Sequence, residues 1–157
     1  MTVLLSLPAL AQSGARGKST PDSCKDADEL FAAYSGREGY QTVVMGQKML
    51  QMMQKKTGKK SDMLNKIKQI RILSSETSDP QLLSLATVLG TEEYELISFT
   101  DDNKETTGFY INDSNSEEKQ FLMVAHRADK EIVMEITGSF DVADISQLST
   151  FGTAAKQ

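Results

Sequence analysis

The chain contains one histidine, His126, and that single imidazole limits the catalytic chemistry that the sequence can carry. A Ser-His-Asp triad, a Cys-His dyad or a histidine-rich zinc site would each have to use it. Alternation within residues 122–127 places His126 on the same side of a strand as Leu122 and Val124, which favours a partly covered structural imidazole. The chain also has no G-x-S-x-G elbow and no P-loop. We therefore expect no catalytic residue and no cofactor-binding residue.

Paired carboxylates are the remaining route to catalysis, because two acids suffice for glycoside hydrolysis. Asp101, Asp102 and Glu135 are the acids that a carboxylate-dependent hydrolase could use, and they define the enzyme alternative. With no Trp and 6% aromatic residues, the stacking platforms typical of sugar sites are scarce. Other acids serve as helix caps or turn residues, and Asp101 and Asp102 themselves lie in a predicted turn. We expect a protein that is not an enzyme.

Two groups of residues have the donor types that metals prefer. Met45, Met49 and Met53 lie at helical spacing, and thioethers on successive turns could converge on Cu(I). Residues 113–118 offer oxygen ligands for calcium but lack the mid-loop glycine of an EF-hand. Methionines on an inward helix face are more often core residues, and residues 113–118 are more simply a hairpin turn. We expect no metal site, and soft-metal binding by the methionines stays open as an alternative.

Charge and cysteine content restrict the partners. The formal net charge of −5 opposes nucleic-acid binding, because nucleic-acid-binding domains usually present a basic surface. Four lysines around Gly58 form a local basic cluster, which we interpret as a solvated loop: Lys55, Lys56, Lys59 and Lys60. Cys24 is the only cysteine, so no disulfide can form within the chain, and pairing between chains stays open.

The first eleven residues have the pattern of the end of a secretory signal peptide. An apolar run from Leu4 ends in Ala9-Leu10-Ala11, a cleavage signature, and it is shorter than the roughly 20 residues that span a bilayer. No Lys or Arg precedes Arg16, so the basic front of a signal is missing. We expect residues 1–11 to be a partial signal peptide and the mature protein to be exported, to the periplasm or the outer surface, without an integral membrane span.

The remaining residues predict one domain, since 157 residues leave no room for a second core. Residues 12–25 are small and polar and predict a flexible leader. The domain is expected over residues 26–149, and residues 150–157 are expected to fray.

The first half of the domain predicts helices and two strands. Asp26 should cap a helix that ends at Gly36, and Asp79 should cap a helix that starts with Pro80 and ends at Gly90. The other expected elements are a β-like run at 39–44, a helix with an inward stripe of Met45, Met49, Met52 and Met53, and a half-buried strand at 67–73.

The second half predicts a meander of four strands, at 94–100, 108–112, 120–127 and 131–137, separated by turn residues. In the last strand Ile132, Met134 and Ile136 should point to a face covered by helices. A short final helix should start at Asp141, with Phe140 stapled onto Ile145. The fold class is therefore α+β, with a mostly antiparallel sheet of about five strands and two or three helices packed on one face.

Several short motifs resemble one protein family. They are Leu30 to Tyr40, Tyr110-Ile111, Phe121 to Val124, Ile136 to Asp141 and Ile145 to Leu148. Together they resemble domain of unknown function 4252, a family of exported proteins of Gram-negative gut anaerobes, over roughly Asp28 to Leu148. The resemblance implies export and a small α+β fold, and it supplies no catalytic residues. It also implies a link to envelope sigma-factor systems.

The function that these observations favour is a non-catalytic, exported binding or interaction domain of the cell envelope. A protein or peptide partner would dock on the wetter face or the edge of the late sheet by adding main-chain hydrogen bonds. The alternatives are an envelope-stress or sigma-pathway accessory protein and the carboxylate-dependent hydrolase.

Overall fold

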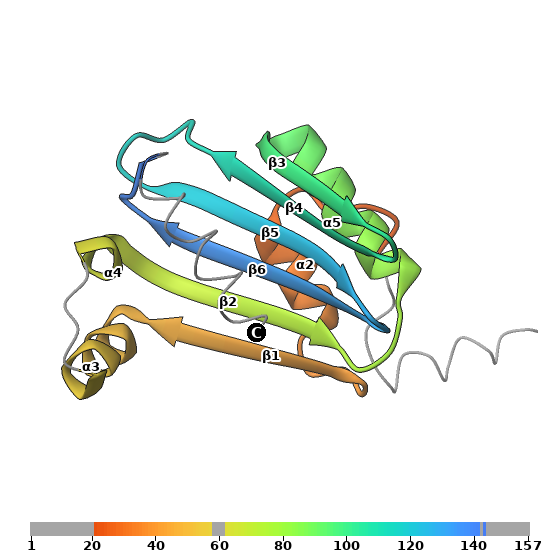
Figure 1. The fold of residues 1–157 in the computed structure, drawn as a ribbon, viewed down its shortest axis with the longest axis horizontal. Coiled ribbons are helices and arrows are strands. Elements are labelled where there is room, and N and C mark those ends of the chain that lie inside the picture. Colours follow the sequence, from red (N-terminus) through yellow and green to blue (C-terminus); the bar gives the residue numbers. More distant parts are fainter. Residues whose placement is uncertain (1–20, 58–61, 142, 144–157) are drawn as a thin grey trace, which may run out of the picture.

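The computed structural model describes residues 21–57, 62–141 and 143, which form one antiparallel sheet with helices (Figure 1). The elements follow in the order α2 (Ala27–Tyr34), β1 (Tyr40–Gly46), α3 (Gln47–Thr57), α4 (Asp62–Lys66), β2 (Ile67–Ser75), α5 (Pro80–Glu93), β3 (Glu95–Asp102), β4 (Glu105–Asn112), β5 (Lys119–Arg127) and β6 (Lys130–Gly138). The strand order is β1-β2-β6-β5-β4-β3, and every neighbouring pair is antiparallel. The expected α+β class is confirmed, with six strands in the described residues and not about five.

The meander forms the larger part of the sheet. Strands β3 to β6 lie side by side in chain order, as the alternating apolar runs and polar turns predict. Asp102 pairs with Glu105 across the first hairpin, and Asn103 between them has a φ of 64°, the left-handed conformation that asparagine tolerates well. The predicted strands are confirmed, with bounds that differ by a few residues at most.

Helix α5 decides which strands lie at the edges. It carries the chain from β2, the second strand of the sheet, to β3 at the far edge, and the meander then returns until β6 pairs with β2. Strand β1 pairs with β2 and forms the opposite edge. The two edges of the sheet are therefore β1 and β3 (Figure 1).

Two of the predicted helix caps, Asp26 and Asp79, are confirmed, whereas most of the helix expected after Asp141 lies outside the described residues. Asp26 accepts a hydrogen bond from the main-chain N–H of Glu29 over 2.9 Å. Asp79 accepts from the N–H groups of Gln81 and Leu82, over 3.1 Å each. Both caps satisfy donors that the first turn of a helix leaves without an intrahelical partner.

The predicted end of α5 at Gly90 is wrong, because the helix continues to Glu93. Gly90 lies inside the helix against the ring of Tyr110. A Cβ at this position would be 2.9 Å from Cδ1 of that ring. Glycine is present here because the helix packs closely on the sheet, and not as a stop signal.

Both faces of the sheet carry apolar residues. Helices α2 and α5 cover the face on which Leu73, Val124 and Val133 lie, in one cluster. The opposite face carries a second cluster with α3: Leu50, Ile67, Ile111, Phe121, Ile136 and Phe140. We expected helices to cover the face of Ile132, Met134 and Ile136, and α3 lies there. Helices α2 and α5, however, lie on the opposite face, where the strand register aligns Val133 with Leu73.

The prediction of an inward-facing methionine stripe is also wrong. Strand β1 continues through Met45 to Gly46, so the helix begins later than predicted, at Gln47. Its register then turns Leu50 and Gln54 into the protein and leaves Met49, Met52 and Met53 exposed. Leu50 takes the core position that the pattern assigned to methionine.

Several predicted segments lie outside the described residues. They are the signal peptide at 1–11, most of the leader at 12–25, Lys59 and Lys60, the helix contact of Ile145, and the tail at 150–157. Lys55 and Lys56 are described, and they belong to the last turn of α3 and not to a loop. In the described part of the chain, no helix has the length and apolar character needed to cross a membrane.

Candidate functional site

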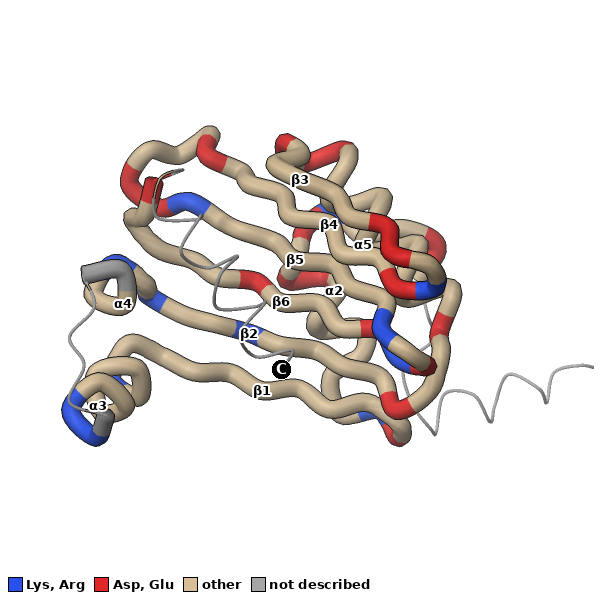
Figure 2. Tube along the Cα trace, viewed as in Figure 1, with Lys and Arg blue, Asp and Glu red and all other residues tan. Residues whose placement is uncertain are grey.

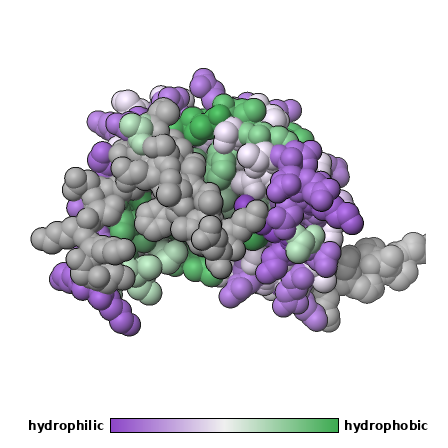
Figure 3. All heavy atoms as spheres, in the orientation of Figure 1, coloured by the Kyte–Doolittle hydropathy of each residue, from purple (hydrophilic) through white to green (hydrophobic). Residues whose placement is uncertain are grey.

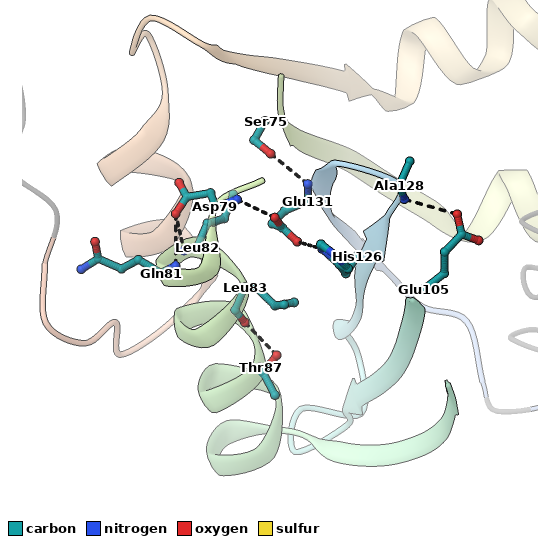
Figure 4. A network of polar contacts seen from close by, with 10 residues as sticks. All are labelled: Ser75, Asp79, Gln81, Leu82, Leu83, Thr87, Glu105, His126, Ala128 and Glu131. Carbon is teal, nitrogen blue, oxygen red and sulfur yellow. Dashed lines mark hydrogen bonds and ion pairs between the residues drawn. The ribbon is translucent and has the colours of Figure 1, made fainter. Parts of the chain in front are cut away.

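His126 belongs to a polar network between the β5–β6 hairpin and the start of α5 (Figure 4). Its Nδ1 forms a hydrogen bond with Oε1 of the buried Glu131, and Oε2 of Glu131 accepts from the main-chain N–H of Asp79 over 2.6 Å. The N–H of Glu131 donates to Oγ of Ser75 over 2.8 Å. The prediction of a partly covered imidazole at a strand end is confirmed, although its contact with Glu131 was not predicted.

Asp79 extends this network to β1. The hydroxyl of Tyr40 donates a hydrogen bond to Oδ2 of Asp79. Burial and this hydrogen bond raise the pKa of Tyr40 to about 12. The ring of Tyr40 packs on that of Tyr34 with 5.0 Å between centroids, and the guanidinium of Arg37 lies over both rings.

The network joins elements and does not assemble a nucleophile beside a base. The Ser75 hydroxyl accepts a hydrogen bond from the main-chain N–H of Glu131. The Glu131 carboxylate is hydrogen-bonded to His126 and to the main-chain N–H of Asp79. Each of these bonds connects residues at least five positions apart, on β2, β5, β6 or the cap of α5. Its physical effect is to satisfy buried polar groups while fixing the helix on the sheet.

The acids of the hydrolase alternative are not brought together. Asp101 and Asp102 are exposed at the end of β3, whereas Glu135 is 2% exposed on β6. Strands β3 and β6 are separated by β4 and β5, and three strand spacings amount to about 14 Å. Carboxylate pairs of glycosidases lie about 5 to 9.5 Å apart.

Glu135 instead pairs with a cation. Nε of Arg71 donates to Oε1 of Glu135 over 2.7 Å, and Nη2 of Arg71 lies 2.8 Å from Oδ1 of Asp28 on α2. The guanidinium also lies 4.6 Å from the ring centroid of Phe31. Burial raises the pKa of Glu135 above its ordinary value, and the charge of Arg71 opposes that shift. This cluster anchors α2 to β2 and β6.

The candidate metal ligands are dispersed as well. Met45 is partly buried on β1, whereas Met49 and Met53 are exposed on α3. Over residues 21–57, 62–141 and 143, no group of three or more His, Cys, Asp or Glu side chains is placed to hold a metal ion. Cys24 packs beside the α2–α5 cluster, and burial together with Glu29 and Asp26 raises the pKa of its thiol.

The most distinctive surface is β3. All eight of its residues are exposed, and they include three large apolar side chains: Leu96, Ile97 and Phe99. The register with β4 shifts between Leu96 and Ser98, which marks a bulge at Ile97. Val88 on the neighbouring helix α5 is exposed too. Figure 3 shows apolar residues along the upper rim of the molecule, beside a hydrophilic group at the β3–β4 turn.

Acidic residues surround this apolar strand. Glu92, Glu93 and Glu95 lie at its start, and Asp101, Asp102 and Glu105 lie at its end. Figure 2 shows the second group around the β3–β4 turn, and Lys104 belongs to the same turn. The sequence predicted an apolar strand here, but its exposure follows from its place at the edge, which no local pattern encodes.

The comparisons with known proteins concern most of the domain. A family model described as Domain of unknown function (DUF4252) matches residues 34–148, more than half of the 157-residue chain. No curated protein and no solved structure shows a significant match. The family match covers α5 and all of the sheet, including the β3 edge. The chain therefore belongs to the DUF4252 family, as the motifs in its sequence indicate.

Proposed function

We propose that this protein is an exported, non-catalytic interaction domain that binds an extended segment of a partner protein along β3. The observation that carries the proposal is a fully exposed edge strand with three large apolar side chains. An edge strand presents unpaired main-chain N–H and C=O groups, and an added strand satisfies them. The apolar run before Ala9-Leu10-Ala11 supports export.

Strand β3 is a better binding edge than β1. Strand β1 has two exposed valines, Val43 and Val44, but its first residue, Tyr40, is engaged by Asp79. Strand β3 exposes every residue and adds an aromatic side chain, Phe99, which offers a large apolar contact.

The charges around β3 specify the partner. If two copies of β3 paired antiparallel along their full length, Glu95 of one copy would lie opposite Asp101 or Asp102 of the other. Like charges directly opposite each other destabilise a strand pair, so the acids oppose self-association. They favour a segment with an apolar centre and Lys or Arg at both ends.

Selection from a displayed library of random peptides against the full chain tests the proposal. We expect enrichment of sequences with an apolar centre and basic ends. Phe99→Lys should abolish their binding, because it places a charge in the centre of the edge. The matched control is Val44→Lys on β1, since Phe99 and Val44 are 53% and 56% exposed. A library that enriches nothing, or clones that bind both variants equally, would contradict the proposal.

Neither the sigma-pathway alternative nor the hydrolase alternative gains support from the described residues or from the family match.

A further inference from the structure

Helix α3 has an outward face that the proposed function does not use. Leu50 and Gln54 point into the protein, and at 100° per residue Met52 lies opposite the midpoint between them. Met52 is 62% exposed, and Met49 and Met53 beside it are also exposed. An exposed group of three thioether side chains on one helix is unusual, because methionine is ordinarily a core residue.

Lysines flank these methionines. Lys48 lies one turn before Met52, and Lys55 and Lys56 lie one turn after it, all exposed. We define the α3 face as Lys48, Met49, Met52, Met53, Lys55 and Lys56. It is locally basic in a chain whose formal net charge is −5. Figure 2 shows this basic corner well apart from the acidic β3–β4 turn.

We propose that the α3 face binds the surface of an anionic lipid bilayer. Lysines beside such a surface are attracted to its headgroups, while apolar side chains between them enter the boundary with the acyl chains. The helix lies flat on the surface and does not span the bilayer. No acidic residue interrupts α3, so nothing on the helix itself opposes this attraction.

A lipid surface fits the α3 face better than an acidic protein does. Lysine and methionine have among the largest side-chain entropies, and a well-packed protein interface would have to fix six such side chains. A fluid headgroup layer lets them remain mobile. The face also has no aromatic residue or arginine, the residue types that dominate protein interfaces.

The topology places β3 away from a surface that binds the α3 face. Helix α3 follows directly from β1, and β1 and β3 are the opposite edges of the sheet. A domain resting on a bilayer through the α3 face therefore holds β3 at the edge away from α3. The lipid proposal does not depend on strand binding at β3, and each can fail alone.

Sedimentation with lipid vesicles tests the proposal. The protein is mixed with vesicles of phosphatidylcholine alone or with 30% phosphatidylglycerol. Every variant is tested as the full chain, so any effect of residues 1–11 is common to all of them. We expect binding to the anionic vesicles that weakens as salt is raised, because the attraction is screened. Each lysine near the surface changes the partition coefficient roughly fivefold, so Lys55→Gln/Lys56→Gln should weaken binding about 25-fold.

Two matched controls separate the α3 face from general charge and apolarity. Lys104→Gln/Lys130→Gln removes the same charge from the β3–β4 turn and from the start of β6, both exposed and far from α3 (Figure 2), and should leave binding unchanged. Met52→Gln should weaken binding, whereas Leu96→Gln should not, although Leu96 is 59% exposed. Equal binding to both vesicle types, equal losses in the controls, or binding to soluble polyglutamate with none to vesicles would each overturn the proposal, and the last would indicate an acidic protein partner.

Discussion

Arg71 and Glu135 lie directly opposite each other on β2 and β6, and Nε of Arg71 donates a hydrogen bond to Oε1 of Glu135 over 2.7 Å. Nη2 of the same arginine reaches Asp28 on α2. The arginine therefore connects α2, β2 and β6. Oε2 of Glu135 is buried and has no hydrogen-bond partner within the described residues. Such a buried carboxylate depends on its cation.

Arg71→Met should lower the free energy of unfolding by about 3 to 5 kcal/mol at pH 7, because it leaves a buried charge uncompensated. Burial raises the pKa of Glu135 above its ordinary value of 4.5, so its contribution to stability is present at low pH and is lost as the pH rises. The loss caused by Arg71→Met should therefore be smaller at pH 4. Urea denaturation at both pH values measures this.

The control for that variant is Lys68→Met, which breaks the exposed ion pair between Lys68 and Glu118 on the sheet surface. It should cost no more than about 1 kcal/mol at either pH. Equal decreases in the free energy of unfolding for Lys68→Met and Arg71→Met would show that the buried pair contributes no more to stability than the exposed pair.

Gly90→Ala should destabilise the protein although alanine favours helices. The added Cβ would lie 2.9 Å from the ring of Tyr110, and overpacking of this kind costs about 1 to 3 kcal/mol. Tyr110→Leu in the same chain should relieve the clash, so the double variant should lose less than the sum of the two single variants. Thermal unfolding of the four proteins measures this coupling, and strictly additive losses would contradict the close approach.

Tyr40 should make the protein sensitive to alkaline pH. Its pKa is raised to about 12 in the folded state by burial and by Asp79, whereas an unfolded tyrosine titrates near 10. Between these values the unfolded chain loses a proton that the folded protein keeps, so the free energy of unfolding falls as the pH rises. Tyr40→Phe lacks this titration, and its stability should approach that of the wild type between pH 10 and 12. Parallel stability curves would refute the assignment.

Neutralising the acids around β3 should promote self-association. Asp101→Asn/Asp102→Asn removes the charges that oppose antiparallel pairing of two β3 strands. Sedimentation velocity should then show dimers at concentrations where the wild type is monomeric, and adding Phe99→Lys should reverse the change. Asp113→Asn/Glu117→Gln, which removes two charges from the β4–β5 turn, is the control and should not dimerise.

Local patterns predicted the features that depend on neighbours in the sequence. Asp26 and Asp79 cap helices because their side chains reach N–H groups two or three residues ahead. The alternating apolar runs and the polar turn residues between them predicted the meander for the same reason. The candidate interaction edge was foreseen only in general terms, as the edge of the late sheet.

By itself, the sequence determined the α+β class, the caps, the turns and the family, because each of these depends on residues that lie close together in the sequence. Only the tertiary structure decided that β3 is an edge, that Val133 and not Ile136 faces α2 and α5, that Gly90 lies under a ring, and that Met52 faces outward. The physical reason is that both faces of the sheet are apolar. Alternation shows that two faces exist, and contacts between residues far apart in the chain select which face each helix covers.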